Sequence, residues 1–157
     1  MKIKHIWSIL CKESLINQDD NLISLNGALE ELTITLSPGK KMTTLPDKVG
    51  IPINYEIVSS WFKNTRDELA KAEIEYTLTS PEGNELFKKV QNMEMPSHIR
   101  RFRSRMKVTG MPIIKAGDYI FKISVKETGE KIFKIVSEIP LEVKIKIENP
   151  SAQKPLN

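Results

Sequence analysis

The sequence predicts a single all-β domain, an antiparallel β-sandwich of about eight to ten strands. Three observations predict this fold: apolar and polar residues alternate in many short runs, turn-forming residues separate those runs, and helical periodicity is thin. The chain has 157 residues, the size of one domain, and its 39% hydrophobic and 28% charged residues are typical of a globular protein. We expect residues 1–148 to form the domain and residues 149–157 to form a flexible C-terminal tail, since the tail contains two prolines and lacks periodicity.

Alternation identifies the strands because successive side chains of a strand point to opposite faces. In the segment 119–126 one face carries Tyr119, Phe121, Ile123 and Val125, and the other carries Lys122, Ser124 and Lys126. The same pattern recurs, in chain order, at Leu32, Ile34 and Leu36, at Ile51, Ile53, Tyr55 and Ile57, at Ile74, Tyr76 and Leu78, and at Leu141, Val143, Ile145 and Ile147. One face of each of these strands is therefore expected to meet the core.

Turn-forming residues lie between the predicted strands. Ser80–Gly83 places proline where a φ near −65° is needed and glycine where a positive φ is needed, which predicts a hairpin into a strand starting near Glu85. Asn64–Lys71 has two interpretations, a helix of about two turns or a polar loop. Further turns are expected at Pro38–Gly39, at Gly117–Asp118, and at Glu127–Glu130 before a strand at Ile132–Val136.

Short motifs near both ends of the chain carry a family resemblance. They are Ser8–Lys12, Asp20–Gly27 and Leu29–Leu32 in the first third, and Gly117–Phe121, with the pattern Gly-x-Tyr-x-Phe, near the end. In these motifs the chain resembles a family of small uncharacterised bacterial proteins. The resemblance implies a β-sandwich of immunoglobulin-like or C2-like type. Because that family is a domain of unknown function, the resemblance assigns no catalytic or binding residue.

Charge and cysteine content indicate the compartment. The net charge of +4 is mildly basic and permits weak attraction to anionic surfaces. Cys11 is the single cysteine, which excludes an intramolecular disulfide framework and favours a reducing compartment. The apolar run His5–Cys11 ends at Lys12 without a cleavage-site pattern, and no stretch approaches the roughly 20 apolar residues of a membrane-spanning helix. We therefore expect a cytoplasmic protein with no membrane partner.

The sequence contains no recognisable catalytic apparatus. The nucleophile elbow, the phosphate-binding loop, the dinucleotide fingerprint and the zinc-protease helix motif are all missing from it. His5 and His98 are the only histidines, and histidine is the commonest general base and metal ligand. We expect no enzyme activity and no cofactor. An enzyme with scattered carboxylates remains an alternative.

Two metal sites compete with structural interpretations. His5 and Cys11 are six positions apart on the same face of one predicted strand, which separates them by about 20 Å and excludes a zinc site shared with His98. Cys11 is interpreted as a buried core thiol. C2-like sandwiches can bind calcium through loop aspartates, but aspartate is also a turn former, and turn formation is the favoured interpretation. The aspartates in predicted loops are Asp19, Asp20, Asp47, Asp67 and Asp118.

The most distinctive segment is His98–Val108, where cations alternate with other residues. On a strand, one face would carry Arg101, Arg103, Arg105 and Lys107, and Phe102, Met106 and Val108 would point to the core. Such a face can bind phosphates, but charge also deters edge-to-edge aggregation. Cross-strand carboxylates are available at Glu73, Glu75, Glu142 and Glu148. Since no aromatic residue is expected on the cationic face, a solvated or salt-bridged surface is favoured over a nucleic-acid site.

A second candidate surface follows the run that begins at Ile51. Val58 and Phe62 fall on the face opposite to the apolar positions of that run, and Trp61 and Phe62 precede a polar loop. Apolar residues on both faces indicate a central strand, a covering loop or an association surface. Contact with a partner is the functional interpretation of these three residues, and additional core beneath a loop is the structural one.

The sequence by itself does not determine a function. It favours a non-catalytic binding or assembly module that acts through a sheet face or end loops. The partner would be an unidentified protein or a second copy of the chain, and a nucleic-acid-binding accessory protein that uses Arg101–Lys107 is the alternative. The candidate interaction surface comprises Arg101, Arg103, Arg105, Lys107, Val58, Trp61 and Phe62.

Overall fold

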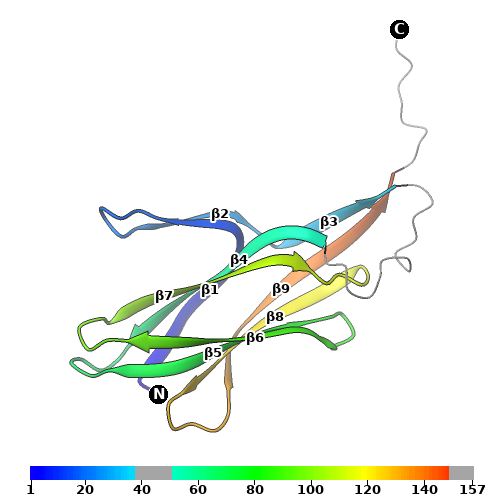
Figure 1. The fold of residues 1–157 in the computed structure, drawn as a ribbon. Coiled ribbons are helices and arrows are strands. Elements are labelled where there is room, and N and C mark those ends of the chain that lie inside the picture. The colour runs from blue at the N-terminus through cyan, green and yellow to red at the C-terminus, as the bar shows by residue number, and fades with distance from the viewer. Residues whose placement is uncertain (38–50, 149–157) are drawn as a thin grey trace.

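The computed structural model describes residues 1–37 and 51–148 and confirms the predicted β-sandwich (Figure 1). A four-stranded sheet with the order β2-β1-β4-β7 packs on a five-stranded sheet with the order β3-β9-β8-β5-β6. The strands are β1 (Ile3–Ile16), β2 (Ile23–Ala28), β3 (Glu31–Leu36), β4 (Ile51–Lys63), β5 (Ala70–Thr79), β6 (Glu85–Met95), β7 (Arg101–Met111), β8 (Gly117–Glu127) and β9 (Lys134–Ile147). The predicted turn at Pro38–Gly39, Asp47 and the predicted tail lie outside the described residues. No helix within the described ranges is long and apolar enough to cross a membrane.

Two features of strand pairing differ from the prediction. β3 pairs with β9 in parallel along its whole length, whereas the other strand pairs of the described residues are antiparallel. The strands predicted separately at Ile132–Val136 and Leu141–Ile147 form one strand, β9, with a register irregularity between its two halves. Pro140 is tolerated within β9 because β3 pairs only with residues 142–147 and leaves this part of the edge open.

Two of the predicted turns are confirmed, whereas Gly117–Asp118 forms the start of β8 rather than a turn. Ser80–Gly83 connects β5 to β6, and Gly83 has a φ of +85°. Glu127–Glu130 lies between β8 and β9. Of the two interpretations of Asn64–Lys71, the polar loop is correct for the segment between β4 and β5, where Asp67 adopts a left-handed φ of 59°.

The core between the sheets contains a polar row as well as apolar side chains. Its largest aromatic members are Trp61, Tyr76, Tyr119 and Phe121. Ser8, Ser59 and Ser104 lie opposite one another on β1, β4 and β7, and the hydroxyl oxygens of Ser8 and Ser59 are 2.7 Å apart. Ser104 Oγ accepts a hydrogen bond from Trp61 Nε1 at 2.9 Å and lies 3.0 Å from Tyr76 Oη. Ser104 therefore satisfies the polar atoms of Trp61 and Tyr76, whereas the Tyr119 hydroxyl bonds to main-chain groups of residues 114 and 115.

Lys63 closes one end of the sandwich. Its side chain is fully buried, and its ammonium group donates to the main-chain oxygens of Glu68 and Pro96, each at 2.6 Å, and of Ser97 at 3.1 Å. These acceptors lie in the β4–β5 and β6–β7 loops. One cation therefore joins both loops and positions the start of β7.

Candidate binding surface

β7 carries the four residues that we call the basic row, Arg101, Arg103, Arg105 and Lys107. Their side chains lie on the outer face of the four-stranded sheet, because the intervening Ser104 and Met106 are buried between the sheets. The predicted division of this strand into a cationic and an inward face is confirmed. β7 is also an edge strand, since it pairs with β4 alone in the described part of the chain.

The two central arginines of the basic row hold the β1–β2 hairpin. Arg103 Nη1 donates to the main-chain oxygen of Asn21 at 2.9 Å and to its side-chain Oδ1 at 3.3 Å. Arg105 Nη1 donates to the main-chain oxygen of Ser14 at 3.4 Å. The end of the hairpin therefore lies over β7 rather than extending the sheet away from it (Figure 1).

The outer cations of the basic row have different partners. The guanidinium group of Arg101 lies 5.6 Å from the ring centroid of Phe62, and that of Arg100 lies 4.6 Å from the same ring. Lys107 Nζ lies 3.5 Å from a carboxylate oxygen of Glu56. Glu56 is thus the one carboxylate within ion-pair distance of the basic row among the residues that the structure describes.

The β1–β2 hairpin buries part of the outer face beneath it. Cys11 and Val58 are fully buried on this face, and Ser14 Oγ donates a hydrogen bond to the Glu56 carboxylate. Cys11 is therefore a buried thiol as predicted, although it lies outside the core between the sheets. Burial, and secondarily the nearby charge of Glu56, raise the pKa of the Cys11 thiol, which keeps it protonated and unreactive.

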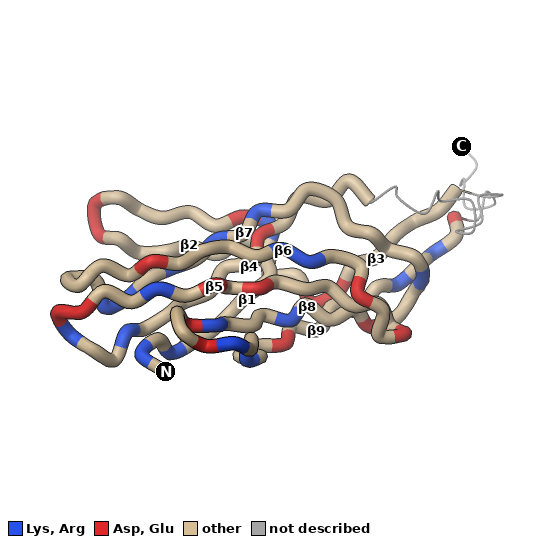
Figure 2. Tube along the Cα trace, turned by 60° about the horizontal axis from the view of Figure 1, so that its bottom comes forward, with Lys and Arg blue, Asp and Glu red and all other residues tan. Residues whose placement is uncertain are grey.

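Carboxylates predicted to neutralise the basic row are paired elsewhere. Glu73 pairs with Lys126 at 2.5 Å, and Glu75 pairs with Lys88 at 2.9 Å. Glu142 pairs with Lys144, so the predicted pairing of these three glutamates with the basic row is wrong. All ion pairs between described residues are made by lysine, and none involves an arginine. Figure 2 shows charges of both signs interspersed along the strands.

The second predicted surface is not a separate patch. Trp61 is fully buried in the core, and Val58 is fully buried beneath the hairpin. Neither side chain can therefore make the predicted contact with a partner. The structural interpretation, additional core, is correct for both. Phe62 is half-buried and lies opposite Arg101 on the neighbouring strand, so the structure joins it to the basic row.

The residues considered for a zinc site do not converge. A β-bulge after His5 shifts the face of β1, so His5 lies opposite the core residue Trp61 while Cys11 lies opposite Glu56 on the other face. The prediction that His5 and Cys11 share a face is therefore wrong. His5 Nε2 lies 2.7 Å from Ser8 Oγ, and burial lowers the pKa of the imidazole.

The aspartates considered for calcium are dispersed. Asp19 and Asp20 lie in the β1–β2 turn, where Asp20 Oδ1 accepts a hydrogen bond from the Leu22 amide at 2.9 Å. Asp67 lies in the β4–β5 loop, and Asp118 lies within β8 rather than in a loop. Across residues 1–37 and 51–148, no group of three or more His, Cys, Asp or Glu side chains is placed to hold a metal ion.

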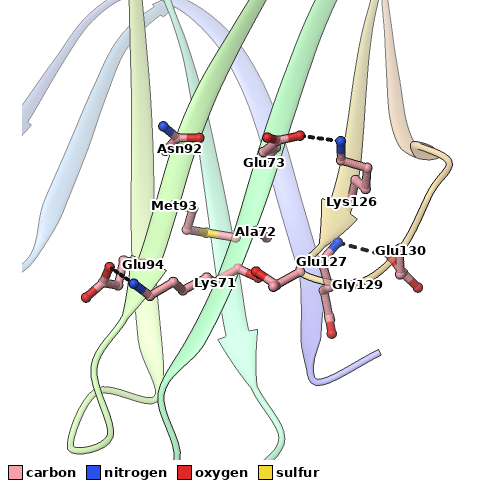
Figure 3. Close-up of a pocket in the computed structure, with 11 residues that line it drawn as sticks. Lys71, Ala72, Glu73, Asn92, Met93, Glu94, Lys126, Glu127, Gly129 and Glu130 are labelled. Atoms are coloured by element: carbon pink, nitrogen blue, oxygen red, sulfur yellow. Dashed lines mark hydrogen bonds and ion pairs between the residues drawn. The ribbon is translucent and has the colours of Figure 1, made fainter.

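A depression of about 500 Å³ lies on the five-stranded sheet near the β8–β9 turn (Figure 3). Its charged side chains are joined in pairs: Lys71 lies 3.0 Å from Glu94, and Lys126 lies 2.5 Å from Glu73. Glu127 also lines it, but its two carboxylate oxygens accept hydrogen bonds from the amides of residues 2 and 3. The depression therefore offers few uncommitted polar groups to a ligand.

The fold and the basic row define a β-sandwich with a cationic edge strand. No protein-family model matches the chain, and no curated protein matches it. Among solved structures, the chain is similar to the C-terminal domain of wzt, with 7% identity and a TM-score of 0.52 over 99% of this chain and 83% of that one. The CooA pilin subunit from enterotoxigenic Escherichia coli aligns with 10% identity and a TM-score of 0.31, over 90% of this chain and 99% of that one. The first similarity supports the β-sandwich fold alone, and the second is too low to support a conclusion.

Proposed function

We propose that this protein is a non-catalytic binding module that recognises an anionic polypeptide through the basic row. One observation carries the proposal: Arg101, Arg103 and Arg105 contact an aromatic ring or neutral oxygens, and no carboxylate within residues 1–37 and 51–148. Contacts of this kind orient a guanidinium group without cancelling its charge. The basic row therefore retains positive charge for an acidic partner.

A polypeptide partner is favoured over nucleic acid by the surroundings of the basic row. Proteins that bind single strands stack bases on exposed aromatic rings. Two aromatic residues lie on this face, and neither presents a fully exposed ring. The ring of Phe62 is contacted by Arg100 and Arg101. Trp7, which lies opposite Ser60 on β1, is half-buried. The cations are spaced two residues apart on a strand, which is also the spacing of alternate side chains on an extended partner.

The test compares two matched triple variants. One replaces Arg101, Arg103 and Arg105 with glutamine, and the other replaces Lys71, Lys122 and Lys126 of the five-stranded sheet with glutamine. Both remove the same formal charge, so a non-specific effect of net charge would be equal in the two. Binding of a fluorescent polyglutamate peptide is measured by anisotropy, with thermal unfolding as the control for folding.

We expect the arginine variant to bind polyglutamate about tenfold more weakly, because three surface charge contacts at about 0.5 kcal/mol each amount to roughly 1.4 kcal/mol. The lysine variant should bind as the unaltered protein does. Equal losses in the two variants would contradict the proposal. A single-stranded oligonucleotide that binds more tightly than polyglutamate, with a steep salt dependence, would support the nucleic-acid alternative instead.

A further inference from the structure

The open side of β7 has a defined set of main-chain groups. The amide of Lys63 donates to the main-chain oxygen of Arg100 at 2.8 Å. This bond identifies Lys63 and Arg100 as a hydrogen-bonded pair and so determines which later pairs of β4 and β7 are hydrogen-bonded. In an antiparallel ladder, hydrogen-bonded and non-hydrogen-bonded pairs alternate. Phe102 and Ser104 therefore bond to β4, and every residue of the basic row directs its N–H and C=O away from β4. The basic row thus supplies both the cations and the main-chain groups that no other described strand pairs.

The inward face of β7 suits an added strand. Its side chains on this face are Phe102, Ser104, Met106 and Val108, none of which is charged. One of the two edge strands of the other sheet, β6, differs: Lys89 lies opposite the fully buried Tyr76 and so falls on the core-facing side of β6. An inward charge on an edge strand opposes the addition of another strand. The inward charge of Lys89 therefore disfavours the addition of a strand to β6, whereas the inward face of β7 carries no such charge.

A second copy of β7 does not fit this edge. Antiparallel pairing of β7 with itself would place arginine or lysine of one copy opposite arginine or lysine of the other on the outer face. A strand with acidic residues at alternate positions would instead place a carboxylate opposite each cation. Its intervening apolar side chains would continue the inward face beside Phe102 and Met106.

We infer that the partner is an extended segment of alternating acidic and apolar residues that adds to β7 as an antiparallel fifth strand of the four-stranded sheet. This inference rests on the proposed function, because it specifies how the basic row recognises its anionic partner. Strand addition provides affinity through main-chain hydrogen bonds, and the alternate side chains provide specificity.

The test uses a peptide of about ten residues in which glutamate and valine alternate. Two derivatives carry the same number of N-methyl groups, on the glutamates in one and on the valines in the other. In an antiparallel pair, each glutamate opposite a residue of the basic row directs its N–H toward β7, and each valine directs its N–H away. The derivatives have the same composition and charge and differ only in which amides are blocked.

We expect methylation of the glutamates to weaken binding about tenfold or more relative to methylation of the valines. Amide exchange at Arg103 and Arg105 should slow in the complex, while exchange at Phe102 and Ser104, already bonded to β4, should be unchanged. Equal affinity of the two methylated peptides would overturn strand addition and leave the proposed function standing. Failure of the unmethylated peptide and polyglutamate alike to bind would overturn the proposed function itself.

Discussion

The two sheets of this sandwich hold their cations in different ways. On the five-stranded sheet, lysines meet carboxylates across strands, as Lys126 meets Glu73 and Lys88 meets Glu75. On the four-stranded sheet, one lysine, Lys107, also meets a carboxylate. Lys63 and Arg103 of this sheet instead meet neutral main-chain oxygens. A carboxylate cancels a positive charge, whereas a carbonyl positions the charge and leaves it in place. The first arrangement suits a soluble, inert face, and the second suits a surface that binds an anion.

The largest effect on stability is expected at Lys63, the fully buried cation that donates to three neutral oxygens. Replacing the fully buried Lys63 with methionine keeps the apolar stem but leaves three main-chain carbonyls without their donor. We expect a loss of about 3 kcal/mol in the free energy of unfolding, measured by denaturant titration. Lys107→Met, which removes a largely exposed lysine, is the matched control and should change stability by less than about 0.5 kcal/mol. A similar small change at both positions would show that the carbonyl contacts of Lys63 do not stabilise the loops.

The fold follows from local patterning, and the contacts of the binding surface do not. Alternation predicts strands and their faces because a two-residue period is visible in any short segment. For this reason the prediction that β7 has one cationic face is correct. The bond between Arg103 and Asn21 joins residues 82 positions apart, and no local pattern specifies such a partner. The same is true of the three carbonyls around Lys63, which come from two different loops.

The error at Trp61 has a specific cause. The apolar alternation that begins at Ile51 ends at Ile57, but β4 continues for six further residues. Ser59, Trp61 and Lys63 extend the core-facing series, and two of these are polar, which hides the period from an apolar pattern. Because Ser104 satisfies the indole nitrogen, Trp61 is buried in the core although its neighbours in this series are polar.

An intermediate effect is expected at His5, whose hydrogen-bond partner is the neutral Ser8 hydroxyl. Burial lowers the pKa of His5 below its ordinary value of 6.5, so below about pH 6.5 the unfolded chain binds more protons at this site than the folded chain. Stability contributed by neutral His5 is therefore complete above this pH and is lost as pH falls toward the folded-state pKa. Denaturant midpoints measured between pH 7 and pH 5 should fall less steeply for His5→Gln than for the unaltered protein. His98→Gln, at an exposed position in the turn before β7, is the matched histidine control, and an equal change in slope for the two variants would contradict the assignment to His5.

The smallest effect is expected for the ion pair between Lys126 and Glu73 on the five-stranded sheet. A double-mutant cycle with Lys126→Met and Glu73→Gln should give a coupling of about 0.5 kcal/mol, since both side chains are partly exposed. Methionine retains an apolar contact with Phe133, over which Lys126 lies, so the cycle isolates the charge term. At about 1 M salt the coupling should nearly vanish, because the screening length falls to roughly 3 Å.

The corresponding cycle with Arg103→Gln and Asn21→Gly tests a charge against a neutral amide. Asn21 has a φ of 57°, which glycine accepts without strain. Its coupling should persist in salt, and equal screening of the two cycles would remove the distinction between the sheets.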